Sequence, residues 1–235
     1  MFGALNLGAL NDNAKLLRTF SEGGIAIVER TLEQSDLVRF AAAFLSDAGG
    51  GARHGRIPAD VLADCSAHPV LSAIASLLNS QSSRLVRIIA FDKTPQANWF
   101  VPWHQDRAIA VGSRAEFPGY QNWTIKDSAL HVEPPIVVLE CMLTLRVHLD
   151  PCGEDDGPLE VVLGSHGLGR LDKAAIAAVA QQGRQQLCLA ARGDILAMRP
   201  LIVHRSQRAR IPTRRRVLHL EYAASPLPAP LTWAF

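Results

Sequence analysis

From residue 84 to the end of the chain, short runs of β-branched and aliphatic residues alternate with glycines, prolines and acidic turns. Runs of this kind are typical of strands that bury one or both faces. The pattern predicts strands over residues 85–91, 137–149, 159–163, 195–198, 201–203 and 217–222. Short strands of this number and spacing favour a sandwich or jelly roll, so we expect a mainly β fold with flanking helices.

The segment before residue 84 shows mostly helical periodicity, after one short strand predicted over residues 25–28. Apolar residues recur at helical spacing over residues 32–45, and the glycines at 49–51 end that helix. Pro69 begins a second helix, because proline is favoured in the first helical turn. A further helix is predicted over residues 171–180. The absence of a linker-like stretch in 235 residues fits one domain, residues 1–235.

Residues 143–149 alternate between apolar and polar side chains. The odd-numbered positions are leucine or valine, and the even-numbered ones are Thr144, Arg146 and His148. Successive side chains of a strand point to opposite faces, so this strand has one apolar and one polar face. A polar face in the middle of a strand predicts that it lines a cavity.

Composition argues against several classes of protein. The formal net charge of +2 gives no general attraction to nucleic acid or anionic membranes. The cysteines at 65, 141, 152 and 188 lack the paired spacing of a zinc knuckle or a redox motif. Neither a signal peptide nor an uncharged apolar run of about 18 residues is present. We expect a soluble, cytoplasmic protein that binds a small-molecule substrate, not nucleic acid or membrane, and the pattern leaves its oligomeric state open.

Two distant segments supply metal-binding side chains: Trp-His-Gln-Asp, which ends at Asp106, and Val-His, which ends at His204. Two imidazoles and one carboxylate can hold Fe(II) on one side and leave the other coordination positions open. In an extended segment His104 and Asp106 project to the same side, and His204 would come from another strand. The rival pair His148 and Asp150 is less favoured, because an aspartate before proline is expected in a turn anyway.

Arg215 follows His204 by eleven positions. An antiparallel hairpin that turns near residues 209–210 would place these two residues opposite each other, with Ser206 on the same face as His204. A guanidinium close to iron is suited to the distal carboxylate of a dicarboxylate such as 2-oxoglutarate.

The arginines near the C-terminus permit another interpretation. They stand at positions 205, 208, 210, 214, 215 and 216. Such a run could bind phosphate or RNA, although it lacks the interleaved aromatic residues of single-strand binders. Strand parity does not choose securely among Arg214, Arg215 and Arg216 for a role near the metal.

Several segments together point to one family more specifically than any single motif does. They are Arg-Ile-Ile-Ala-Phe-Asp-Lys-Thr at 87–94, Asn-Trp at 98–99, Trp-His-Gln-Asp at 103–106, Gly-Pro-Leu at 157–159, Gly-Ser-His at 164–166, and His-x-Ser at 204–206 with Arg215. With these segments the chain resembles the phytanoyl-CoA dioxygenase family of Fe(II)/2-oxoglutarate-dependent oxygenases, in particular its small bacterial members. The resemblance covers most of the chain.

The resemblance implies a double-stranded β-helix, the cupin-like jelly roll, with supporting helices. By position it implies that His104, Asp106 and His204 bind iron. It also implies that Ser206 and Arg215 hold the distal carboxylate of 2-oxoglutarate.

Other positions match the family loosely or depart from it. Trp123 falls near an aromatic residue that contacts the co-substrate in some relatives. Leu163 stands where the family often has proline, and the asparagine that often follows His-x-Ser is absent from residues 207–213. Related halogenases carry a small residue at the position of Asp106, so hydroxylation is favoured over halogenation.

The resemblance therefore implies a dioxygenase that uses Fe(II), 2-oxoglutarate and O2. It would hydroxylate a C–H bond of a small organic substrate and convert 2-oxoglutarate to succinate and CO2. Lys93, Asn98, Trp99 and Arg146 are candidate substrate contacts. Two alternatives stay open: a metal-dependent hydrolase or isomerase on the same fold, and a non-catalytic phosphate- or RNA-binding protein that uses the arginine run.

Overall fold

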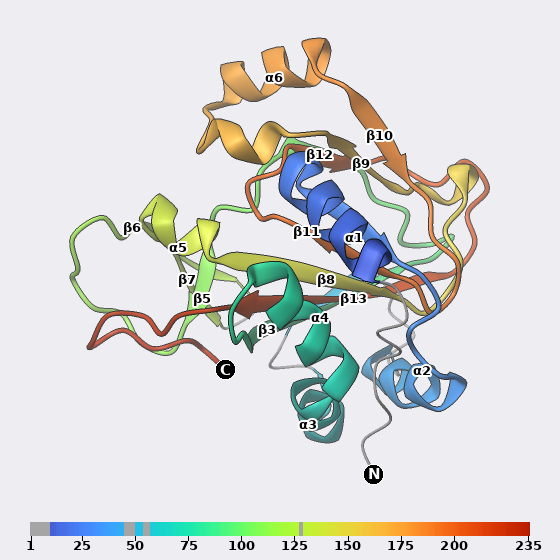
Figure 1. Cartoon of the computed structure of the whole chain (residues 1–235), viewed down its shortest axis with the longest axis horizontal. Helices are drawn as coiled ribbons and strands as arrows, with labels where there is room; N and C mark the ends of the chain where they lie inside the picture. The colour runs from blue at the N-terminus through green and yellow to red at the C-terminus, as the bar shows by residue number, and fades with distance from the viewer. Residues whose placement is uncertain (1–9, 45–49, 54–56, 127–128) are drawn as a thin grey trace.

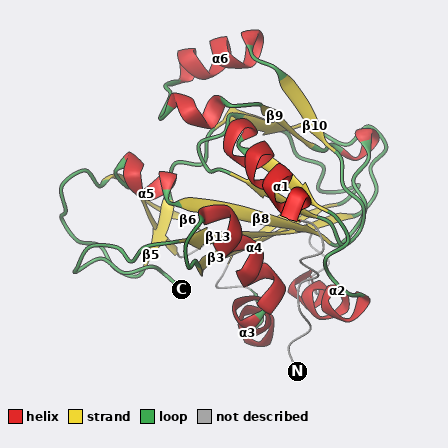
Figure 2. Ribbon diagram, in the orientation of Figure 1, coloured by secondary structure: helices red, strands yellow, loops and turns green. Residues whose placement is uncertain are grey.

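Three antiparallel sheets form the centre of the protein in a computed structural model that describes residues 10–44, 50–53, 57–126 and 129–235 (Figures 1 and 2). The six-stranded sheet has the order β1 (Ile25–Val28), β11 (Ile195–Met198), β8 (Met142–His148), β13 (Arg215–Ala223), β3 (Arg84–Lys93) and β2 (Gly50–Arg53). The four-stranded sheet has the order β10 (Gln185–Cys188), β9 (Leu159–Val162), β12 (His204–Ser206) and β4 (Val101–His104). β5 (Ile109–Val111), β7 (Ala129–Glu133) and β6 (Gln121–Lys126) form the third sheet. This arrangement is a mainly β jelly roll with flanking helices, as the sequence predicts.

The helices lie mainly before and between the strands. They are α1 (Leu10–Gly23), α2 (Gln34–Ala41), α3 (Ala59–Ala67), α4 (Pro69–Asn79), α5 (Ile136–Glu140) and α6 (Lys173–Gln182), with short 3-10 turns at Ala42–Phe44, Glu154–Asp156 and Ser165–Leu168. Among the described helices, none alone is long and apolar enough to cross a membrane, and one bent pair, α3 with α4, reaches that length and composition together.

The six-stranded sheet has an apolar face and a polar face. Leu145 on β8 and Leu218 on β13 belong to the main core cluster, which also contains Phe40 of α2 and Leu71 of α4. Burial of such a side chain contributes about 1.5–3 kcal/mol, so the helices are held against this face. Arg146 on β8 points to the opposite face, where it lines a cavity. The alternation predicted for residues 143–149 is thus confirmed.

The predicted strands over 159–163 and 195–198, and those over 85–91 and 217–222, correspond to β9, β11, β3 and β13, with small differences in their ends. The predicted strand over 137–149 is wrong in its first part, where α5 forms before β8. Pro135 precedes this helix, and proline is well suited to a helix start. A short apolar run cannot by itself distinguish a buried strand from a helical turn.

Other boundaries also differ from the predictions. The predicted strand over 201–203 is a buried turn, and pairing begins only at His204 of β12. The helix predicted over 32–45 is α2 followed by a 3-10 turn to Phe44, and Leu45 lies outside the described residues. The helix predicted over 171–180 is α6, which begins after its N-cap Asp172. Helices α1 and α3 were not predicted.

The hairpin predicted between His204 and Arg215 is wrong. β12 pairs with β4 and β9 in the four-stranded sheet, whereas β13 pairs with β3 and β8 in the six-stranded sheet. The chain between them crosses from one sheet to the other. Both side chains nevertheless line the same cavity, because the two sheets face each other across it.

Candidate functional site

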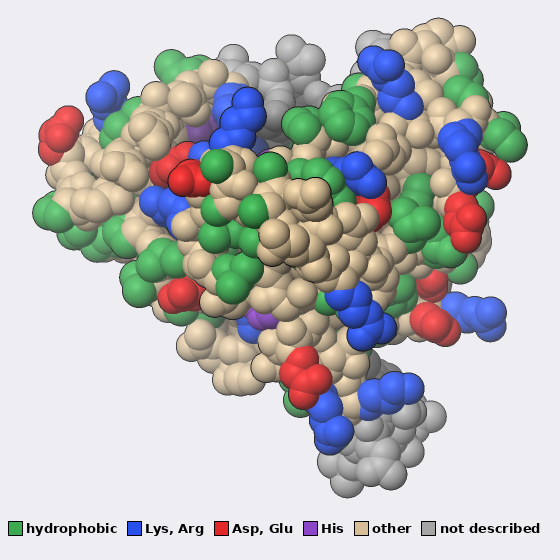
Figure 3. Space-filling view, turned by 90° about the horizontal axis from the view of Figure 1, so that it is seen from above, with side chains coloured by type: hydrophobic (Ala, Val, Ile, Leu, Met, Phe, Trp, Pro, Cys, Tyr) green, Lys and Arg blue, Asp and Glu red, His purple; other side chains and the backbone are tan. Residues whose placement is uncertain are grey.

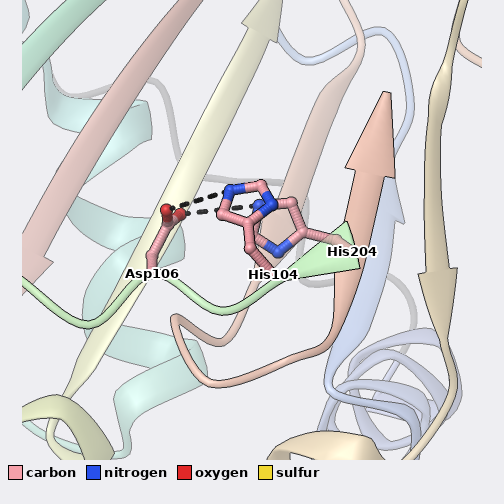
Figure 4. A group of neighbouring side chains, drawn as sticks. All are labelled: His104, Asp106 and His204. Carbon is pink, nitrogen blue, oxygen red and sulfur yellow. Dashed lines mark ion pairs between the residues drawn. The ribbon is translucent and has the colours of Figure 1, made fainter. Parts of the chain in front are cut away.

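His104 and His204 lie side by side because their strands are neighbours. His104 ends β4, His204 begins β12, and the two residues are partners in the antiparallel register. Their ring centroids are 4.1 Å apart. The carboxylate of Asp106 lies 3.7 Å from His104 Nε2 and 3.8 Å from His204 Nε2 (Figure 4). The Asp106 N–H donates to the Pro200 carbonyl at 2.9 Å, which anchors this segment beside β12.

Backbone carbonyls orient both imidazole rings. His104 Nδ1 lies 2.8 Å from the Pro102 oxygen, and His204 Nδ1 lies 2.9 Å from the Ile202 oxygen. In each neutral ring Nδ1 therefore carries the hydrogen and Nε2 keeps the lone pair. A ring N–H held by a carbonyl is the usual support of a metal-binding histidine. Both Nε2 atoms face Asp106, as a shared ligand position requires.

The protonation states also suit a metal site. Burial, with the neighbouring His104 adding to the effect, lowers the pKa of His204 to about 4. Burial raises the pKa of the Asp106 carboxyl, but His204 and His104 lower it more, and the result is a pKa of about 2. At neutral pH the His204 ring is neutral and Asp106 is ionised, which are the forms that bind a divalent ion.

Within the part of the chain that the structure describes, these three residues form the one group of three His, Cys, Asp or Glu side chains that could hold a metal ion. Their ligand atoms lie within 4.8 Å of one another. Two nitrogens and one oxygen that leave positions open toward a cavity fit non-heme Fe(II). The rival pair makes other contacts: Asp150 accepts a hydrogen bond from Arg216 Nε at 2.8 Å, and His148 is buried on β8.

The sequence interpretation missed the role of Gln105, which stands between two candidate ligands. Its Nε2 donates to the Leu201 oxygen at 2.7 Å and to the Gly169 oxygen at 2.8 Å, and its Oε1 accepts from the Leu171 N–H at 2.9 Å. The sequence did contain a signal for this role. In an extended segment, the residue between two ligands points away from them, toward the neighbouring segments. Gln105 ties the end of β4 to the segments before β12 and α6.

A cavity of about 400 Å³ opens beside the triad. Its size is within the range of small-molecule sites. The six-stranded sheet contributes Arg87, Ile89, Phe91, Lys93, Arg146, Arg215, His219 and Glu221. The other walls include Trp99, Val101, Lys126, Glu133, Leu159 and Ser206.

Lys93, Ser206 and Arg215 gather in one part of this cavity. Lys93 and Arg215 are cross-strand partners on β3 and β13, and Lys93 Nζ donates to Ser206 Oγ of the opposite sheet at 2.9 Å. Arg215 is 4% exposed, and its NH1 lies 3.7 Å from Cys152 Sγ. Among the described residues its Nε has no hydrogen-bond partner. Two cations and a hydroxyl group in a buried space are suited to bind a carboxylate.

The surroundings of Lys93 disfavour its charged form. Burial, followed by repulsion from Arg215, lowers the pKa of the Lys93 ammonium to about 7. An anion bound beside Lys93 would relieve this repulsion and favour its charged form.

A second row of polar groups crosses the same face of the sheet. Arg146 NH1 lies 3.0 Å from His219 Nδ1, and His219 Nε2 lies 3.4 Å from Glu221 Oε1. Arg87 NH1 donates to the same Glu221 oxygen at 2.9 Å. All four side chains line the cavity.

The remaining candidate contacts separate into two groups. Trp99 lines the cavity, with its ring centroid 5.5 Å from Lys93 Nζ. Asn98 instead clamps two loops, because its side chain donates to the Ala209 oxygen at 2.9 Å and accepts from the Ala209 N–H at 2.8 Å. Trp123, on β6, packs against the second core cluster, and Arg114 lies 5.5 Å from its ring centroid. The structure thus brings Lys93, Trp99 and Arg146 to the cavity and places Asn98 and Trp123 elsewhere.

The arginine run is largely neutralised by carboxylates. The ion pairs are Arg205–Glu160 at 2.6 Å, Arg210–Asp155 at 2.5 Å, Arg214–Asp92 at 2.8 Å and Arg216–Asp150 at 2.7 Å. Arg215 points into the cavity, which distinguishes it from its two neighbours. Figure 3 shows basic and acidic side chains interspersed on the face seen there. Four of the six arginines of the run are thus paired with carboxylates.

Comparisons with known proteins identify a family and a fold. A family model described as phytanoyl-CoA dioxygenase (PhyH) matches residues 20–217. No curated protein matches the sequence at a significant level.

Three solved structures illustrate the shared fold. AviO1 from Streptomyces viridochromogenes Tue57 is 21% identical, with a TM-score of 0.66 over 92% of this chain and 98% of that chain. The non-heme alpha ketoglutarate dependent carbocyclase SnoK from nogalamycin biosynthesis is 17% identical, with a TM-score of 0.66 over 90% of this chain and 84% of its own. EctD from S. alaskensis with bound Fe is 18% identical, with a TM-score of 0.66 over 92% of this chain and 79% of its own.

Proposed function

The chain belongs to the phytanoyl-CoA dioxygenase family of Fe(II)/2-oxoglutarate-dependent oxygenases, and from this membership we propose that it hydroxylates a C–H bond of a small organic substrate. One observation carries the proposal. The His104, Asp106 and His204 triad opens into the same cavity as Lys93, Ser206 and Arg215, which together are suited to bind a carboxylate. A metal site next to a carboxylate site is what a chelating keto acid with a distal carboxylate requires.

The triad would hold Fe(II) through two Nε2 atoms and one carboxylate oxygen. The Pro102 and Ile202 carbonyls keep both rings in the tautomer that leaves Nε2 free. When bound, Fe(II) and 2-oxoglutarate supply the oxidation: the keto acid and O2 give succinate and CO2, and the second oxygen atom goes to the substrate.

The rest of the cavity would orient the co-substrate and the substrate. Arg215 would grip the distal carboxylate of 2-oxoglutarate, while Lys93 and Ser206 add two further polar contacts. Trp99 and Phe91 form an apolar wall nearby, and their rings are 6.5 Å apart between centroids. An apolar wall in the cavity would exclude water and hold the substrate in a fixed orientation.

Hydroxylation is the favoured outcome, because Asp106 stands at the position where related halogenases carry a small residue. The carbocyclase SnoK nevertheless has a similar fold and a different reaction outcome. Product analysis must therefore accompany any assay of 2-oxoglutarate turnover. The cavity volume of about 400 Å³ is small compared with an acyl-CoA molecule. This favours a substrate without a CoA group.

The metal-free protein should be titrated under argon with Fe(II) and then with 2-oxoglutarate. We expect the visible absorption band of a keto acid chelated to Fe(II), and we expect it to disappear in His104→Ala and Arg215→Ala. Arg208→Ala is a matched control, because Arg208 belongs to the same run but is exposed on the surface. If iron binds to the native protein and the band is absent, the oxygenase function is wrong and a metal-dependent hydrolase or isomerase takes its place.

A further inference from the structure

The cavity contains more buried positive charge than its own carboxylates neutralise. Three cationic side chains in its wall are 7% exposed or less: Lys93, Arg146 and Arg215. Arg87, by contrast, is paired with Glu221 at 2.9 Å. Among the described residues, no carboxylate forms an ion pair with any of the three cations. An uncompensated buried charge is costly, so anions are expected in this cavity.

The co-substrate neutralises part of this charge. One carboxylate of 2-oxoglutarate, together with Asp106, would offset the two charges of Fe(II). Its distal carboxylate would lie between Lys93 and Arg215 and would offset one of their two positive charges. The charge of Arg146 then remains without a counterion.

Arg146 is also held in a fixed place. His219 lies opposite Arg146 in the register of β13 and β8, and its Nδ1 is 3.0 Å from Arg146 NH1. The guanidinium carbon lies 5.6 Å from the centroid of the Phe91 ring. The buried Nε of Arg146 has no hydrogen-bond partner among the described residues. A preorganised guanidinium with an unused donor is suited to receive an anion.

Arg146 is attached to the sheet at a different level from Lys93 and Arg215, although its charge still acts on both. Arg215 pairs with Lys93, whereas Arg146 pairs with His219, four residues further along β13. Four residues of a strand correspond to roughly 13 Å between backbone positions. The guanidinium lies near the Phe91 ring and lines the same cavity as the His104, Asp106 and His204 triad.

We propose that the substrate carries a carboxylate and that Arg146 binds it, held in place by His219. This inference rests on the proposed function, because it assumes that 2-oxoglutarate occupies the space beside Lys93 and Arg215. It names an acidic small molecule as the class of substrate and assigns Arg146 to substrate specificity.

The test compares small carboxylic acids with their primary amides, which have nearly the same shape but no charge. The probes are a panel of short aliphatic and aromatic monocarboxylic acids, each beside its amide. The native protein, loaded with Fe(II) and 2-oxoglutarate under argon, is titrated with each probe. Binding is read from the change in the visible band and from the thermal midpoint, and succinate formation is measured separately in air.

We expect at least one acid to bind roughly 10- to 100-fold more tightly than its amide, the effect of one charge-assisted hydrogen-bonded pair. Arg146→Gln should remove this preference while the affinity for 2-oxoglutarate changes less than about threefold, and Arg146→Lys should keep part of it. Arg208→Gln is the control, because Arg208 is an exposed cation outside this cavity. This control should keep the full preference.

Each contrary result has its own meaning. Equal binding of acids and amides would overturn the proposal. If Arg146→Gln weakens 2-oxoglutarate binding as much as it weakens acid binding, Arg146 belongs to the co-substrate site, and the assignment to substrate is wrong although the oxygenase stands. Absence of the visible band in the native protein would instead overturn the proposed function itself.

Discussion

The ammonium group of Lys93 is buried and lies near the positive charges of Arg215 and Arg146, and all three effects disfavour its charged form. These influences lower its pKa from 10.5 to about 7. Below pH 7 the side chain is charged and attracts a carboxylate, and above pH 7 it loses its proton. Affinity for 2-oxoglutarate should therefore fall by about tenfold between pH 7 and pH 8.5.

The dissociation constant of 2-oxoglutarate, measured from the visible band over this pH range, tests the role of Lys93. Lys93→Arg should keep high affinity with little pH dependence, because arginine stays charged. Lys93→Met should bind more weakly, also with little pH dependence. A pH dependence of native size in Lys93→Met would show that another group titrates.

At the scale of elements, the geometry of the candidate metal site depends on how β4 is tied to its surroundings. The amide of Gln105 makes hydrogen bonds to Gly169, Leu171 and Leu201. Gln105→Leu removes all three while leaving the ligands in the chain. Loss of such supporting contacts typically weakens metal binding about 10- to 100-fold.

A competition titration with Co(II) or Mn(II) measures this effect of Gln105 directly. Gln186→Leu on β10 is a suitable control, because that glutamine is exposed and lies on another strand. Metal affinity of native strength in Gln105→Leu would mean that the backbone contacts of Asp106, including its N–H on the Pro200 carbonyl, are sufficient to hold the site.

At the scale of the whole molecule, buried His148 connects stability with pH. It is 2% exposed, and burial, with Arg146 next in effect, lowers its pKa to about 3. In the unfolded chain it takes up a proton near pH 6.5, whereas in the folded protein it does not. The unfolded state thus binds more protons between these values, and stability is lost as the pH falls from 6.5 toward 3.

The contribution of His148 amounts to about 2 kcal/mol between pH 7.5 and pH 5. We expect His148→Leu to lose less stability over this interval than the native protein, by about that amount. Urea unfolding of both proteins at the two pH values measures the difference. An identical loss in both would exclude His148 as the source.

The spacing of apolar and polar residues along the chain was sufficient to predict much of the fold. The alternation over residues 143–149 predicted both faces of β8, because a strand presents successive side chains to opposite sides. Helix and strand could not be told apart in the apolar run at 136–140, and α1 was missed. The sequence pattern also identified His104 and Asp106 as a pair, since side chains two positions apart on an extended segment project to the same side.

Contacts between distant segments decided the rest of the site. His204 and Arg215 are close in sequence, and a hairpin was the natural expectation, yet they lie on different sheets and meet only across the cavity. The choice of Arg215 over Arg214 and Arg216 likewise came from the carboxylates of Asp92 and Asp150, which pair with its neighbours. Spacing along the chain sets which face of a strand a side chain occupies. Which strands become neighbours, and which charges remain unpaired, depends on packing energies summed over the whole molecule.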